Sequence, residues 1–234
     1  MNKLIITGFA IAFAFASFGK DAEEPQLFVK PGSAKGFVAV VNKQTKVEEK
    51  EFVEAAGTIR KTKSYVFKFV KDDAEAKGAT VVIRLVDEAG RPPMTVSPEV
   101  GRGEMNVAVL VDDIKSDAGK KKFLVSRARR EFLRTIAYAF GAGGSQFPGN
   151  IMAATKLRDL DYCSEFLPVD TLYALEKSAK DRGLKPEIAV TYDVACEEGW
   201  APQPVTEEQK KIWKEVHAMP ENPIKIKFDP KTDK

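Results

Sequence analysis

The feature that most constrains this sequence is a long amphipathic segment between residues 117 and 140. Its apolar side chains recur at the spacing of one helix face: Val125, Phe132, Ile136 and Phe140. Ser116 or Asp117 is suited to capping the start of a helix, and Gly141 to ending one, because glycine readily adopts the conformation that terminates helices. The segment is therefore predicted to form one long helix.

Strand-like and helix-like segments are grouped unevenly along the chain. Apolar or alternating runs predict strands at 36–42, 64–70, 80–86 and 106–111, with a short edge strand at 94–96. Helical spacing predicts helices at 47–60, 168–182 and 206–217, while 187–194 and 224–228 are further strand candidates. This order indicates an α+β or a three-layer α/β architecture. We assign the α+β class, with a mixed sheet followed by the long helix and a helical C-terminal part.

The N-terminus has the layout of a secretory signal peptide. A short basic start precedes an apolar run from Leu4 to Phe18. This run is shorter than the roughly 20 residues that a membrane-spanning helix needs. Ala14-Phe15-Ala16 offers a cleavage motif of two small residues, so we predict cleavage after Ala16 or after Gly19. A secreted or periplasmic protein is the expected outcome.

The rest of the chain is expected to form one domain. After the signal peptide at 1–19, we predict a flexible lead-in at 20–35, the domain at 36–199, and a Pro-rich tail at 200–234 with one helix packed on the domain. The net charge of +3 is small and the charges are interspersed, so nucleic acid is not an expected partner. No membrane span is predicted in the mature chain, and the sequence does not indicate an oligomeric state.

The few cysteines and histidines limit which disulfides and metal sites the chain can form. The chain has two cysteines, Cys163 and Cys196, and an even count in an exported protein makes a disulfide possible. Such a bridge would stabilise the fold by about 3 kcal/mol. The chain has one histidine, His217, so a zinc site built from several histidines cannot form. We predict no metal and no other cofactor.

The long helix contains a degenerate form of a known peptidase pattern. The metzincin pattern is H-E-x-x-H-x-x-G-x-x-H. Placed on residues 130–140, its glutamate falls on Glu131 and its glycine on Ala137. The three histidine positions are then Arg130, Arg134 and Phe140.

In this pattern and in its order of elements, the chain resembles the zincin metallopeptidases of the metzincin type. It resembles the archaemetzincin-like members most, and the resemblance covers roughly residues 36–185. The resemblance implies that a mixed sheet precedes the active-site helix. It also implies that Asn150-Ile151-Met152 forms a methionine turn and that 168–182 is the closing helix. In that family the glutamate is the general base.

The substitutions remove the chemistry that the resemblance would otherwise imply. A guanidinium has no lone pair to offer a metal and stays protonated, and phenylalanine cannot ligate. We therefore predict a catalytically inactive, metal-free protein in which Met152 survives as packing. The predicted function is a binding module for a peptide, protein or glycan at the cell envelope. The alternatives are an active envelope hydrolase with a non-standard site, or a structural envelope protein.

The arginines of the helix have two interpretations. Arg127, Arg130 and Arg134 lie near one helix face, where Glu131 can pair with its neighbours and contribute a few tenths of a kcal/mol per pair. Alternatively, the three line the old cleft and bind an anion, such as a peptide carboxylate, through forked hydrogen bonds.

Overall fold

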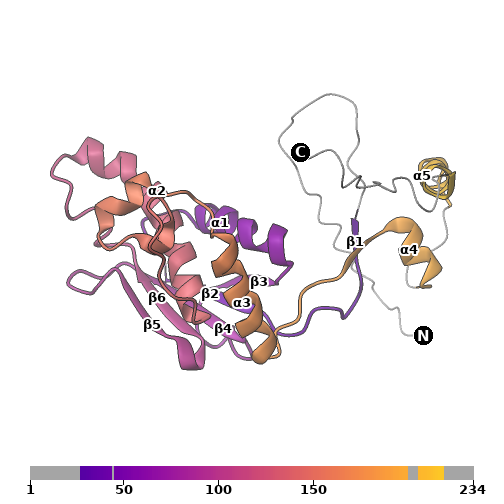
Figure 1. The fold of residues 1–234 in the computed structure, drawn as a ribbon, viewed down its shortest axis with the longest axis horizontal. Helices are drawn as coiled ribbons and strands as arrows, with labels where there is room; N and C mark the ends of the chain where they lie inside the picture. Colours follow the sequence, from indigo (N-terminus) through magenta and orange to yellow (C-terminus); the bar gives the residue numbers. More distant parts are fainter. Residues whose placement is uncertain (1–26, 44, 200–204, 219–234) are drawn as a thin grey trace, which may run out of the picture.

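A five-stranded mixed sheet forms the centre of the domain. The computed structural model describes residues 27–43, 45–199 and 205–218. Within them the strand order is β3-β2-β4-β6-β5 (Figure 1). The strands are β2 (Val38–Asn42), β3 (Phe67–Val70), β4 (Val81–Val86), β5 (Met94–Ser97) and β6 (Arg102–Asn106). β5 is antiparallel to β6, and the other strands pair in parallel.

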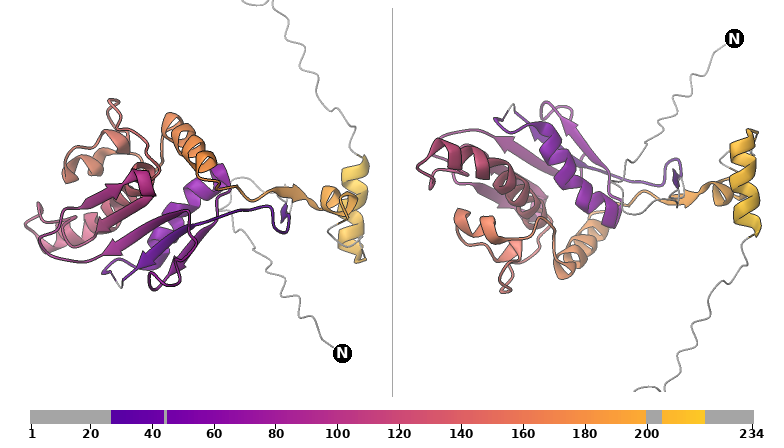
Figure 2. Two further views of the ribbon diagram at one scale, coloured as in Figure 1. Left: turned by 90° about the horizontal axis from the view of Figure 1, so that it is seen from below. Right: turned by 90° about the horizontal axis from the view of Figure 1, so that it is seen from above.

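Helices pack on one face of this sheet (Figure 2). They are α1 (Glu49–Lys63), α2 (Asp117–Ala139) and α3 (Val169–Asp181). Phe52 of α1 meets Phe132 of α2 edge to face, with ring centres 5.3 Å apart, and both side chains are fully buried. The predicted α+β class is confirmed. None of the helices in the described part of the chain combines the length and apolarity that crossing a bilayer requires.

Strand β2 is buried on both faces, which explains its unbroken run of apolar residues. Val38 and Val40 face the helices, whereas Ala39 and Val41 belong to a second, smaller core on the other face. The turn after β3 closes that second core with Ala76.

The long predicted helix is confirmed as α2. Ser116 caps it by accepting a hydrogen bond from the backbone nitrogen of Gly119 at 3.2 Å. The helix lies close to β6 because Gly103 has no side chain. A Cβ atom at that position would approach the Thr135 methyl carbon to 2.8 Å.

Strand β6 corrects one prediction. The apolar run 106–111 was expected to be a strand, but β6 ends at Asn106, and Val107 and Leu110 are buried in the turns that follow. The Asn106 side chain directs the exit from the sheet, because it donates to the carbonyl oxygens of Glu88 and Arg91 and accepts from the Ala108 backbone nitrogen.

Short helical turns connect α2 to α3. These are η2 (Ile151–Ala153) and η3 (Leu157–Tyr162), and both contact α2. A further turn, η1 (Pro98–Val100), joins β5 to β6.

Two terminal segments form an arm outside the sheet domain. β1 (Leu27–Val29) pairs antiparallel with β7 (Ala189–Thr191), and α4 (Tyr192–Glu197) and α5 (Glu207–Ala218) follow. Figures 1 and 2 show α4 and α5 away from the sheet.

The arm contains parts of three predicted segments. Residues 27–29 of the predicted lead-in form strand β1, α4 lies at the end of the predicted domain 36–199, and the tail helix α5 contacts α4. The predicted signal peptide and the strand candidate 224–228 lie outside the described residues.

We predict that Gly103→Ala will lower the free energy of unfolding by about 1–3 kcal/mol, because the added methyl group must displace Thr135 or shift α2. Chemical denaturation of the full chain measures this change. Gly143→Ala is the matched control, since a Cβ atom there meets no atom within 4 Å. Equal effects of the two variants would contradict the proposed close approach of α2 to β6.

Candidate functional site

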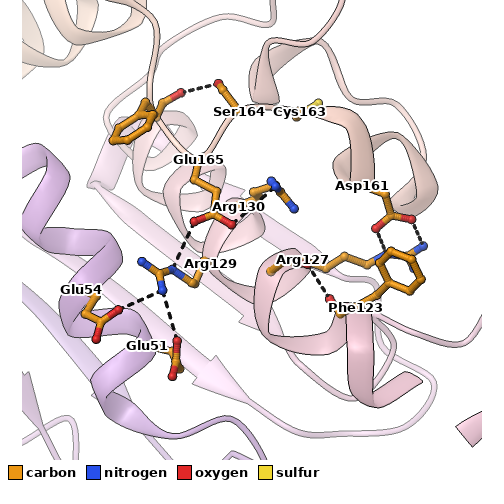
Figure 3. Close-up of polar contacts among 12 residues, drawn as sticks. Glu51, Glu54, Phe123, Arg127, Arg129, Arg130, Asp161, Cys163, Ser164 and Glu165 are labelled. Carbon is orange, nitrogen blue, oxygen red and sulfur yellow. Dashed lines mark hydrogen bonds and ion pairs between the residues drawn. The ribbon is translucent and has the colours of Figure 1, made fainter. Parts of the chain in front are cut away.

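Arg127 is the most buried arginine on α2. It is 2% exposed, and all five of its N–H donors have acceptors. Nε and Nη2 donate to the two carboxylate oxygens of Asp161, both at 2.7 Å (Figure 3). Nη1 donates to the Leu110 carbonyl oxygen at 2.8 Å, and the fork also holds Asp113. The hydrogen bond from Arg127 lowers the pKa of Asp113 below its ordinary value.

This arrangement removes Arg127 from the candidate anion-binding set. The guanidinium has no donor left for an external anion, so its role is to join α2 to the turn after β6 and to η3. Sequence reasoning missed its two carboxylate partners. The acidic pair Asp112-Asp113 after the predicted strand was the available signal, whereas Asp161 is 34 residues away in sequence.

The next two arginines hold the loop that precedes α3. Arg129 pairs with Glu51 and Glu54 of α1, at 3.3 and 2.9 Å. Glu165 lies between Arg129 and Arg130, 3.6 and 3.5 Å from their guanidinium nitrogens (Figure 3). The predicted anion candidate Arg130 therefore already faces a carboxylate of its own chain.

Arg134 forms the third link between α2 and the loops. Its Nη1 donates to the Glu131 carboxylate at 2.5 Å, and its Nη2 donates to the Ala154 carbonyl oxygen at 2.7 Å. Glu131 is 1% exposed, and burial raises its pKa while the Arg134 charge opposes that shift. The pairing of Glu131 with an arginine three residues later is the one that the sequence predicted for a helix face.

The remaining pattern residues lie where no ligand could reach them. Phe140 is in the hydrophobic core, and Ala137, at the glycine of the pattern, lies inside α2 and is fully buried. The chain instead turns at Gly141, whose φ is 84°.

The predicted methionine turn is the short helix η2. The Met152 backbone nitrogen donates to the Asn150 side chain at 2.8 Å, and the Met152 side chain is buried in the main core. The Ser145 nitrogen donates to the Met152 carbonyl oxygen at 3.0 Å, which ties the glycine-rich loop to this turn.

These residues do not fit the zinc site of the pattern. Arg130 and Arg134 carry no lone pair, and both are engaged by carboxylates. Within the described residues, no group of three or more His, Cys, Asp or Glu side chains could hold a metal ion. The one histidine of the chain, His217, lies on α5 in the arm.

The two cysteines considered for a disulfide both lie among the described residues. Cys163 and Cys196 are not bonded to each other. The Cys163 thiol donates to the carbonyl oxygens of Asn150 and Asp159, and burial raises its pKa. Cys196 is on α4, so the two residues belong to the domain and to the arm respectively (Figure 1).

The order of elements follows the predicted family arrangement. A mixed sheet precedes α2, the chain turns at Gly141, Met152 lies in a turn against α2, and α3 closes the domain. The fold is zincin-like.

Comparison with known proteins finds similar solved structures. No protein-family model and no curated protein matches the sequence. An archaemetzincin from Methanopyrus kandleri is similar in structure, with a TM-score of 0.45, 14% identity, and coverage of 65% of this chain and 99% of that one. A zinc-dependent peptidase from Methanocorpusculum labreanum has a TM-score of 0.44 and 12% sequence identity, with coverage of 59% of this chain and 99% of that one. An archaemetzincin from Archaeoglobus fulgidus has a TM-score of 0.39 and 10% sequence identity, with coverage of 58% of this chain and 98% of that one. The likeness concerns the fold alone.

We predict that Arg127→Met will lower the free energy of unfolding by about 3–5 kcal/mol, because it leaves Asp161 and Asp113 facing an apolar side chain. Denaturation monitored by circular dichroism measures the loss. Arg129→Met is the control and should cost at most about 1 kcal/mol, since that pair is more exposed. A loss of similar size in both variants would refute the structural role assigned to Arg127.

Proposed function

We propose that this protein is an exported, zincin-like binding protein that has no zinc-dependent peptidase activity. The observation that carries this proposal is the position of Arg134, which is bonded to Glu131 on its own helix and to Ala154 beyond the methionine turn. A zinc peptidase needs neutral imidazoles for the metal and a carboxylate free to accept a proton from the metal-bound water. With the pattern placed on residues 130–140, that carboxylate is Glu131, and a permanent cation, Arg134, engages it.

The segment from the end of α2 to the middle of α3 carries exposed apolar side chains, most of them aromatic, which we call the aromatic surface. Several large apolar residues between α2 and the middle of α3 are exposed to solvent: Phe147, Tyr162, Phe166, Val169 and Tyr173. Exposed aromatic side chains concentrate at binding surfaces, because they offer a large contact area with little rotamer entropy to lose. This supports a peptide, protein or glycan as the ligand.

Export is proposed from the N-terminal segment 1–19, with its basic start, apolar run and small residues at the cleavage site. The protein would then act in the periplasm or outside the cell. Export and ligand binding together give the proposed role, which is binding at the cell envelope.

An active hydrolase is the alternative function. It would need a catalytic site other than the residues at positions 130, 131, 134 and 140. A structural envelope protein would need no ligand at the aromatic surface.

We predict that the purified mature protein will contain far less than one zinc per chain and will not cleave unstructured peptide substrates, with or without added zinc. Elemental analysis and a fluorescent peptide-cleavage assay measure these outcomes. Thermal unfolding should be unchanged by a chelator, because the links from α2 to the loops are ion pairs and hydrogen bonds. Stoichiometric zinc, or cleavage that a chelator abolishes, would overturn the proposal.

We predict that Tyr162→Ala with Phe166→Ala will weaken binding to a ligand identified on peptide or glycan arrays by at least about tenfold, a loss of about 1.4 kcal/mol. Val100→Ala is the matched control, because Val100 is also an exposed apolar residue but lies on η1. Equal binding by both variants would exclude the aromatic surface. No ligand on either array would favour the structural alternative.

A further inference from the structure

The end of α2 defines how the peptidase pattern lies on this chain. In the pattern, the glycine stands three residues after the second histidine and three before the third. α2 continues through Ala137 to Ala139, and Gly141 is the residue with a left-handed φ of 84°. Placing the pattern glycine on Gly141 moves its histidine positions to Arg134, Tyr138 and Gly144.

These three residues lie together in the structure. The Arg134 guanidinium carbon is 5.8 Å from the centre of the Tyr138 ring. A Cβ atom built on Gly144 would lie 3.6 Å from the Tyr138 hydroxyl oxygen and 3.5 Å from the Met152 carbonyl oxygen. The three positions therefore meet beside the methionine turn, whereas Phe140, the third position in the other placement, is in the core.

The glutamate of the pattern falls on Thr135 in this placement. Thr135 is fully buried, and its hydroxyl group donates to the Glu131 carbonyl oxygen at 2.8 Å. Its methyl group faces Gly103 of β6. The position thus contributes to the packing of α2 on the sheet and has no carboxylate to act as a base.

Arg134 supplies a positive charge at the first of these positions. The guanidinium is held by the buried carboxylate of Glu131 and the carbonyl oxygen of Ala154, two residues after Met152. Like a metal ion, it is a permanent cation that contacts both the helix and the turn. Unlike a metal ion, it is covalently part of α2 and cannot be removed by a chelator.

We infer that the guanidinium of Arg134 is a built-in cation that takes the place of the metal and fastens α2 to residues 152–154. The inference rests on the proposed absence of zinc from the natural chain. It adds that the lost metal-binding positions are 134, 138 and 144, and that metal and guanidinium are structurally interchangeable there.

The test restores histidines in the two placements and compares them. The first variant carries Arg134→His, Tyr138→His and Gly144→His, and the matched control carries Arg130→His, Arg134→His and Phe140→His. A Cβ atom at Gly144 meets only ordinary van der Waals contacts, and the φ of Gly144 is not positive, so histidine fits there. Binding of Co²⁺ is followed by its visible absorption spectrum, and binding of Zn²⁺ by calorimetry.

The first variant is expected to bind one Co²⁺ or Zn²⁺ with a tetrahedral cobalt spectrum, and the control is expected not to. The melting temperature of the first variant without metal should fall below that of the natural chain and should recover when zinc is added. Binding by the control alone, or no binding by a first variant whose circular dichroism is native, would overturn the inference.

A second variant keeps the inference testable if the triple variant does not fold. Arg134→Met should speed amide hydrogen exchange in residues 150–156, and Arg134→Lys should restore part of the protection. Unchanged exchange in Arg134→Met would also overturn the inference. Zinc in the natural chain would instead refute the proposed function, so the two failures are distinguishable.

Discussion

The position of the loops around α2 depends on the buried fork of Arg127. Residues 140–168 contain only short helical turns, so their own backbone hydrogen bonds cannot fix them against the long helix. Arg127 supplies that constraint by binding the turn after β6 and η3 with one side chain. The energetic value of such a buried pair lies mainly in what its loss would expose, because a charge left without its partner in the interior is costly.

Three successive turns of α2 repeat this design. Arg127 holds η3, Arg129 and Arg130 hold Glu165, and Arg134 holds the carbonyl of Ala154. α2 therefore carries a row of arginines that bind the protein to itself.

Periodicity was sufficient to predict most of the fold. The predicted long helix and the helices at 47–60 and 168–182 correspond to α2, α1 and α3, because each buries one apolar stripe. The strand at 106–111 was wrong because its apolar residues are buried in turns, whereas the true strand β6 carries Arg102 and Glu104. A polar strand of this kind has no alternating apolar signal to detect. The carboxylate partners of Arg127 were beyond prediction for a different reason, since they depend on tertiary contacts across 14 and 34 residues.

The pairing of β1 with β7 has a consequence for the order in which the molecule can be completed. Leu27 is opposite Thr191, so the first strand of the described chain waits for one of the last segments to be synthesised. Local contacts such as those between α1 and α2 close much shorter loops and can form earlier. The sheet domain can therefore assemble while the N-terminal strand is still unpaired.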